Sequence, residues 1–253
     1  SESKISGKAN SIVESEPVDK TIERNKPEID IVSEPELRLG NELINREISG
    51  VFSVPRGLEG KVDFWRLIFT KYGEKQLVFH HRDYPEIVYS VLDLSELTPA
   101  LSGKALAKRV NDETDRETTR ITETLLFLAE GNDPKTPFQR RLVKLFAHVP
   151  NVGPNTYKNA AEVGQVRNQR GVKERFSNGL IRSGRYLHEM ERVFIAAGLP
   201  KELTRLPLVE SSFDYTAYSS VGAAGIWQFM RGTGKRTMRI DATIDERKDP
   251  IES

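Results

Sequence analysis

The fold is decided by residues 198–250, which read GLPKELTRLPLVESSFDYTAYSSVGAAGIWQFMRGTGKRTMRIDATIDERKDP. Pro200 stands at a natural first position of a helix, two residues after Gly198, which ends the preceding helical pattern. The apolar side of this helix consists of Leu203, Leu206 and Val209. Pro207 lacks a backbone N–H donor, so we expect a kink there. The pattern therefore predicts a short, kinked helix that ends near Glu210.

The position of Glu210 suits a group that exchanges protons. At the C-terminal end of a helix, the negative end of the helix dipole favours the neutral acid over the carboxylate. Apolar neighbours act in the same direction, and the sequence offers Leu206, Val209 and Phe213. A general acid that works near neutral pH needs a carboxyl that keeps its proton. A glutamate at a helix end is more often a solvated surface group, so these residues alone leave both interpretations open.

Two motifs at a fixed separation resemble the soluble lytic transglycosylase (SLT) family. Glu210-Ser211 is similar to the family's first motif. The second is similar to the family's Gly-Leu-Met-Gln motif and consists of Gly222, Gly225, Ile226, Trp227 and Gln228. The later run DERKDP, at residues 245–250, resembles a membrane-bound murein branch of the family, and residues 182–187 (RSGRYL) resemble it more weakly.

The resemblance implies a lysozyme-like fold and cleavage of peptidoglycan glycan strands. In the family, one glutamate, here Glu210, protonates the oxygen between N-acetylmuramic acid (MurNAc) and N-acetylglucosamine (GlcNAc). The carboxylate then takes the proton of the muramic acid's own 6-hydroxyl, which gives a 1,6-anhydro end and consumes no water. Because the N-acetyl group of the substrate can stabilise the positive centre, no second carboxylate is required. Asp214 lies nearby in the sequence but is not assigned that role.

Five further positions are candidates for contact with the glycan: Ser219, Gly225, Trp227, Gln228 and Met230. By resemblance, the hydroxyl of Ser219 faces the glutamate and the sugar, and Gln228 forms a hydrogen bond near the scissile bond. Each position also has a plainer interpretation. Ser219 suits a turn, Gly225 suits a positive φ angle, and Gln228 suits an ordinary polar contact. Trp227 suits a core as well as a sugar ring, and a methionine such as Met230 more often packs than binds.

The sequence departs from the family pattern in two places. Arg231 stands where the membrane-bound branch usually has proline, and Ser253 ends the sequence before the family's later Ala-Tyr-Asn motif. We therefore expect the lysozyme-like domain to be incomplete at its C-terminal side, without the tyrosine that forms one wall of the cleft. Two alternatives to a lytic transglycosylase remain open. One is a non-catalytic peptidoglycan-binding fragment, and the other is a hydrolytic muramidase on the same fold.

The whole chain predicts a mainly α-helical protein of three parts. Residues 1–40 are rich in Ser, Glu, Lys and Pro and contain no aromatic residue, which predicts a disordered tail. Residues 41–170 are expected to form a helical region of unknown role. Residues 171–253 are assigned to the lysozyme-like transglycosylase domain, which begins with a helix over residues 172–197.

Within residues 41–170, apolar spacing predicts helices at residues 103–130 and around residues 142–149. Two β-type runs, at residues 76–79 and 87–91, are separated by a turn-like segment. They predict a short hairpin.

Composition excludes several classes of function. The chain has 38 Lys and Arg against 37 Asp and Glu, so its net charge of +1 does not favour a nucleic-acid partner. It has no cysteine, which rules out disulfides, thiolate catalysis and Cys-based metal sites. His80 and His81 are adjacent and would point to opposite faces of a strand, so we expect no metal and no cofactor.

The expected partner is the peptidoglycan glycan strand, and the resemblance implies a periplasmic or cell-envelope location. No stretch approaches the roughly 18 apolar residues of a membrane span. Contact with a membrane is therefore expected only through an anchor that this sequence does not contain.

Overall fold

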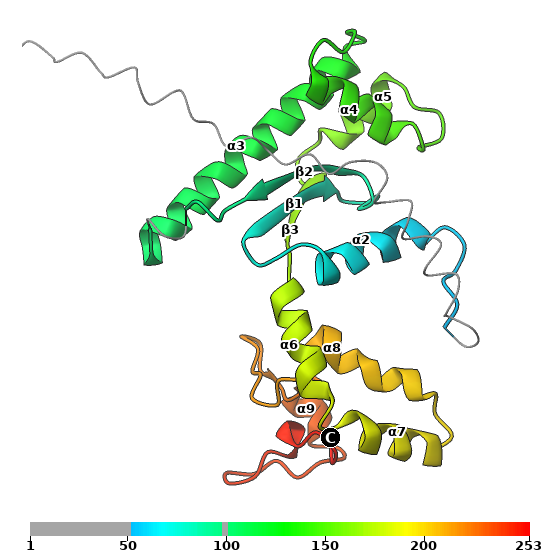
Figure 1. Ribbon diagram of the computed structural model, residues 1–253, viewed down its shortest axis with the longest axis vertical. Helices are drawn as coiled ribbons and strands as arrows, with labels where there is room; N and C mark the ends of the chain where they lie inside the picture. The colour runs from blue at the N-terminus through cyan, green and yellow to red at the C-terminus, as the bar shows by residue number, and fades with distance from the viewer. Residues whose placement is uncertain (1–51, 98–100) are drawn as a thin grey trace, which may run out of the picture.

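The computed structural model of the protein describes residues 52–97 and 101–253 (Figure 1). The tail predicted at residues 1–40 lies outside the described residues. As the sequence predicts, the described part is mainly helical. It consists of a region with a small sheet, followed by a segment of short helices and turns that carries Glu210. Among the described residues, no helix combines the length and the apolar character needed to cross a membrane.

A three-stranded antiparallel sheet organises the first region. β1 (Gln76–His81) lies between β2 (Val88–Asp93) and β3 (Val166–Arg170). The hairpin predicted from the two β-type runs is confirmed, because β1 pairs with β2 in a register that places Val78 opposite Val91.

The third strand corrects the expectation that residues 41–170 contain only helices and a hairpin. β3 has the sequence VRNQR, which is polar and largely exposed. It forms because its backbone pairs with β1, with Leu77 opposite Arg170 and His81 opposite Val166. A strand that is held by backbone hydrogen bonds at a sheet edge needs no alternating apolar side chains, so the pattern of residues 166–170 does not predict a strand.

Helices cover both faces of the sheet (Figure 1). Alternation along β1 directs Leu77 and Phe79 to one face and Val78 to the other. The first face packs against α3 (Gly103–Ala129), α4 (Pro137–Phe146) and α5 (Pro154–Ala160). The core on this side consists of Leu77, Phe79, Ile87, Tyr89, Leu94, Ile121, Leu125, Leu128, Leu142, Phe146, Tyr157 and Ala160. The second face packs against α2 (Glu59–Thr70), and its core consists of Phe64, Leu67, Ile68, Tyr72, Val78, Val88 and Val91.

The long helix α3 confirms the apolar stripe predicted at residues 103–130. Ile121, Leu125 and Leu128 are buried against the sheet. Glu117 is also buried, where it accepts a hydrogen bond from the hydroxyl of Ser90 on β2 and forms an ion pair with Arg120. Because its charge is paired and its oxygens are hydrogen-bonded, this carboxylate is tolerated in the interior.

His81 organises the turn between β1 and β2. Its Nδ1 accepts hydrogen bonds from the backbone N–H groups of Asp83 (3.0 Å) and Tyr84 (3.3 Å), and its ring lies 6.2 Å from that of Phe146. Burial lowers the pKa of His81 below its ordinary value, against the smaller opposing effect of the Asp83 charge. The neutral ring is therefore the folded form, since a proton on Nδ1 would remove both acceptor bonds.

We expect the folded protein to lose stability as the pH falls below about 6.5. Because the pKa of His81 is lower in the folded state, the unfolded chain binds more protons in this window. The contribution of His81 is complete above the unfolded pKa and is lost as the pH falls towards the folded value. His80, whose pKa is also lowered by burial, acts in the same direction. Thermal unfolding followed by circular dichroism should show Tm falling between about pH 7.5 and about pH 5.

His81→Asn keeps an acceptor near the position of Nδ1 but does not titrate, so it should reduce the slope of Tm against pH. The matched control is His148→Asn, because the His148 side chain is exposed. It should keep the wild-type slope. Equal slopes in the two variants would contradict the assignment to His81.

The C-terminal segment begins with two helices rather than one. The helix predicted over residues 172–197 is divided into α6 (Lys173–Ser183) and α7 (Leu187–Ala196). The break falls at Gly184, a poor helix former, and the hydroxyl of Ser183 bonds to the carbonyl of Leu180 just before it. The change of direction allows Met190 to join a third core, whose buried members are Met190, Leu208, Phe213 and Ile226.

α6 is attached directly to the region around the sheet (Figure 1). Between β3 and α6, Val172 donates its backbone N–H to the carbonyl of Ile68 and Lys173 donates to that of Tyr72, both at 3.0 Å. A Cβ at Gly171 would lie 2.2 Å from the Tyr72 carbonyl oxygen, so only glycine allows this approach. The start of α6 is therefore fixed against the end of α2.

Candidate functional site

Glu210 is the last residue of a helix with two parts. A 3₁₀ turn, η2 (Lys201–Arg205), leads into α8 (Leu206–Glu210). Pro200 caps η2, and Pro207 lies in the first turn of α8, where a missing N–H breaks no hydrogen bond. The predicted end of the helix at Glu210 is confirmed, and beside Pro207, where we expected a kink, the helix changes from 3₁₀ to α at Leu206.

The surroundings of Glu210 differ from the apolar enclosure that the sequence suggested. Glu210 is exposed, and its neighbours Leu206 and Val209 are 50% and 61% exposed. Only Phe213 of the three expected apolar neighbours is buried, and it points into the third core. In residues 52–97 and 101–253, no side chain forms a hydrogen bond or an ion pair with the Glu210 carboxyl group. This carboxyl is therefore available to a ligand that arrives from solvent.

The turn after Glu210 has an unusual backbone. Ser212 and Phe213 have φ angles of 55° and 57°, in the left-handed region that non-glycine residues rarely adopt. Ser211, just before them, is buried, and its Oγ donates a hydrogen bond to the carbonyl of Ile226 at 2.9 Å. This bond connects the Glu210-Ser211 motif to the Gly225-Gln228 motif across 15 residues. The sequence did not mark Ser211 as a residue that joins the two motifs.

The second motif forms a small hairpin. β4 (Ala223–Ala224) pairs with β5 (Phe229–Met230), and the chain reverses between them. Before β4, Ser219 closes a tight turn. Its Oγ accepts from the backbone N–H of Ala223 at 2.9 Å, and its own N–H donates to the carbonyl of that residue at 2.8 Å. Ser219 therefore has the structural role of a turn residue, and its contact with a sugar remains a prediction.

The remaining predicted glycan contacts lie within or beside this hairpin. The side-chain amide of Gln228 donates to the carbonyl of Gly225 at 2.8 Å, which supports the positive φ of 54° at Gln228. The Trp227 ring stacks on Phe194 of α7, with centroids 5.8 Å apart and an angle of 10° between the planes. One face of the indole is thus covered by protein. Met230 is 45% exposed at the end of β5.

The side chain of Arg247 also holds the hairpin in place, a structural role that the sequence analysis did not predict. Its side chain is almost completely buried and binds both oxygens of Asp245, at 2.8 and 2.7 Å. Its Nη1 donates to the carbonyls of Gly222 and Phe229, both at 2.9 Å. Arg247 and Asp245 thus form an ion pair within the run DERKDP. The run DERKDP alone did not indicate that Arg247 would also donate hydrogen bonds to two backbone carbonyls.

Gly225 packs closely against the backbone of Arg247, which leaves no room for a side chain. Its φ angle is +77°, and a Cβ at this position would lie 1.5 Å from the carbonyl oxygen of Arg247. The residue is buried, so the structure accounts for the glycine by packing against protein backbone. Direct contact of Gly225 with a glycan stays a prediction.

Asp214, the carboxylate nearest to Glu210 in the sequence, is already engaged. Its Oδ1 accepts hydrogen bonds from the Thr216 hydroxyl (2.6 Å) and backbone N–H (2.9 Å). These bonds, together with the charges of Arg182 and Arg175, hold the pKa of Asp214 below its usual value. Asp214 is therefore an ionised turn residue and does not suit the role of a proton donor.

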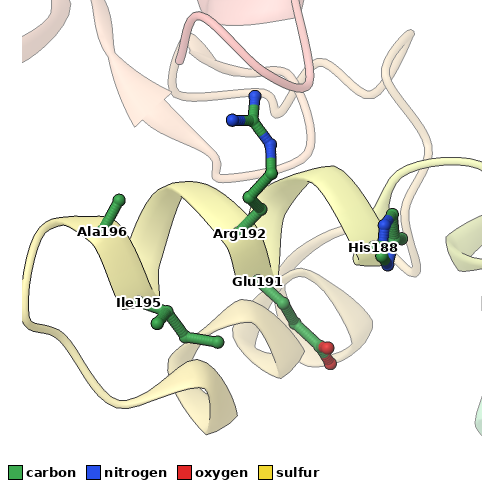
Figure 2. Close-up of a pocket in the computed structure, with 5 residues that line it drawn as sticks. All are labelled: His188, Glu191, Arg192, Ile195 and Ala196. Carbon is green, nitrogen blue, oxygen red and sulfur yellow. The ribbon is translucent and has the colours of Figure 1, made fainter.

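A shallow pocket lies on α7 and does not involve the predicted site. Figure 2 shows its lining residues on one helix, with Glu191 and Ile195 on one side of α7 and Arg192 on the other. Its charges are already paired, Glu191 with Arg205 and Arg192 with Glu189. Within the described ranges, no three His, Asp or Glu side chains come together as metal ligands would.

Comparison with known proteins points to the same segment as the geometry. A family profile described as Transglycosylase SLT domain matches residues 196–253. Membrane-bound lytic murein transglycosylase D of Escherichia coli strain K12 is 43% identical over 56 residues, which are 22% of this chain and 12% of that protein. A putative tributyltin chloride resistance protein of Alteromonas sp. strain M-1 is 36% identical over 69 residues, 27% of this chain and 33% of that protein.

The matched stretches thus cover at most a third of these relatives. No solved structure matches the chain significantly. The profile match contains Glu210, the left-handed turn after it, the Gly225 hairpin and Arg247. Residues 196–253 therefore match the SLT family of transglycosylase domains.

Proposed function

We propose that the protein is a lytic transglycosylase that cleaves the bond between MurNAc and GlcNAc in peptidoglycan. The observation that carries this proposal is the placement of Glu210. It ends α8 with an exposed carboxyl group that has no partner among the described residues, inside the segment that matches the SLT domain. A group that must both give and take a proton has to be free of permanent partners and open to the substrate.

In the proposed reaction, Glu210 acts twice. As the acid it protonates the glycosidic oxygen, and the MurNAc–oxygen bond breaks as the GlcNAc hydroxyl leaves. As the carboxylate it then accepts the proton of the MurNAc 6-hydroxyl, whose oxygen bonds to C1. The product is a 1,6-anhydro end, and Glu210 regains its proton.

The proposal assigns the lysozyme-like domain to residues 171–253 and the glycan contacts to Ser219, Gly225, Trp227, Gln228 and Met230. Ser211 supports this grouping, because its hydrogen bond to Ile226 places the hairpin residues beside the end of α8. We further propose a location in the periplasm or cell envelope, where peptidoglycan is found.

The products of the reaction test the proposal directly. Digestion of purified sacculi should release muropeptides with 1,6-anhydro ends. Mass spectrometry distinguishes them from hydrolysis products, because an anhydro-muropeptide is lighter than the corresponding hydrolysis product by one water molecule. Reducing ends would instead indicate a muramidase on the same fold. Binding to sacculi without new ends would indicate a non-catalytic binding protein, and either result would contradict the proposed reaction.

A further inference from the structure

A guanidinium group from α6 holds the turn that follows Glu210. Arg182 donates from Nε and Nη2 to the carbonyl oxygen of Ser212, at 3.0 and 2.6 Å. The contact joins residues 30 positions apart. Hydrogen bonds from a charged donor are stronger than neutral ones, and two donors on one planar group also fix the direction of the carbonyl. Arg182 is half-buried, so water competes only in part for this contact.

α6 approaches the same residue at a second point, one turn earlier. A Cβ at Gly179 would lie 3.0 Å from both the Cβ and the carbonyl oxygen of Ser212. Gly179 and Arg182 are three residues apart and therefore lie on the same side of α6. Ser212 is thus held by close packing at Gly179 and by hydrogen bonds from Arg182.

The Ser212-Phe213 turn has a strained backbone that needs contacts from the surrounding structure to keep its conformation. Ser212 and Phe213 are consecutive non-glycine residues with left-handed backbones. Such conformations persist only where the surrounding structure determines them. Relaxation of either residue would turn the end of α8, and with it Glu210, relative to the hairpin that Ser211 contacts.

The other end of α6 is fixed by the region around the sheet. Besides the backbone bonds of Val172 and Lys173, the rings of Phe69 on α2 and Phe176 on α6 lie 5.3 Å apart. Arg182 is close to the opposite, C-terminal end of the helix. A helix fixed at its start is a rigid support for a side chain that acts at its end.

We propose that Arg182 is a positioning residue for Glu210, which holds the Ser212-Phe213 turn and so sets the direction in which the Glu210 carboxyl meets the glycan. The inference rests on the proposed function and extends the same site. Arg182 acts through the Ser212 carbonyl and contacts no reacting atom.

The test compares three variants of the protein. Arg182→Met keeps most of the apolar stem and removes every donor, whereas Arg182→Lys keeps a charged donor. Arg185→Met is the matched control, since Arg185 is exposed three residues further on. Initial rates on soluble peptidoglycan strands should show kcat lowered about 10- to 100-fold in Arg182→Met with KM nearly unchanged, because displacement of a catalytic group by about 1 Å costs about 100-fold. Arg182→Lys should recover part of kcat, and Arg185→Met should match the wild type.

All rates are measured well below the Tm of each variant, so that loss of folding does not contribute. Wild-type kcat in Arg182→Met would overturn the inference and leave the proposed function intact, provided that Glu210→Gln is inactive. A lower kcat that Arg182→Lys does not recover, accompanied by an equal loss in Arg185→Met, would also overturn it, because it would indicate a general effect on the fold. A wild-type protein that forms no new ends would overturn the proposed function and this inference together.

Discussion

Glu210→Gln is expected to abolish the formation of new glycan ends while leaving the fold and the binding of glycan nearly intact. Glutamine has the volume of glutamate but can neither give nor take the proton, and such transfers contribute about 10²- to 10⁴-fold to the rate. The fold should tolerate the change because Glu210 is exposed and its carboxyl has no partner in the described part of the chain. The assay is release of anhydro-muropeptides from sacculi, together with a binding assay on the same sacculi.

Glu202→Gln is the matched control for this variant. Glu202 is also exposed and lies in η2, in the same segment, but is separated from the turn by all of α8. It should keep wild-type activity. If Glu210→Gln retains more than about a tenth of the wild-type rate, Glu210 is not the acid and base of the reaction, since loss of either transfer alone should cost more.

The sequence predicted well those elements that are determined by residues close to one another along the chain. α3 follows from the apolar stripe at Ile121, Leu125 and Leu128, and the hairpin of β1 and β2 follows from two β-type runs around a turn. The end of α8 at Glu210 follows from the proline and leucine spacing before it. In each case, neighbouring residues carry the signal themselves.

The features that the sequence did not predict depend on contacts between distant residues. β3 forms because β1 offers it an edge, although its own side chains are polar. Arg247 becomes the support of the hairpin because Gly222 and Phe229 turn their carbonyls towards it. Glu210 was expected among apolar neighbours because Leu206 and Val209 share its helix, yet both face outward. Spacing shows which residues share a face, and only tertiary packing decides which face is covered.

Gly225→Ala is expected to destabilise the C-terminal segment strongly, although it adds only one methyl group. The new Cβ would lie 1.5 Å from the Arg247 carbonyl oxygen, a distance that no side-chain rearrangement can relieve, because both partners are backbone. Residues 245–249 would have to move away, and Arg247 would lose its bonds to Gly222 and Phe229. We expect the free energy of unfolding of this segment to fall by about 4 kcal/mol or more, the range of severe core mutations.

Gly222→Ala is the control that separates backbone strain from steric conflict. Gly222 also has a positive φ, +90°, but the nearest atom to its added Cβ would be the Tyr218 hydroxyl at 3.8 Å. Alanine there should cost only the strain of a left-handed residue, about 1–2 kcal/mol. Hydrogen exchange over residues 217–249 should therefore show wide loss of protection in Gly225→Ala and modest loss in Gly222→Ala. The sheet around β1 should remain protected in both, because its core is separate from that of the hairpin. Equal losses in the two variants would mean that Gly225 is required only for its φ angle, and that its contact with Arg247 does not hold the segment together.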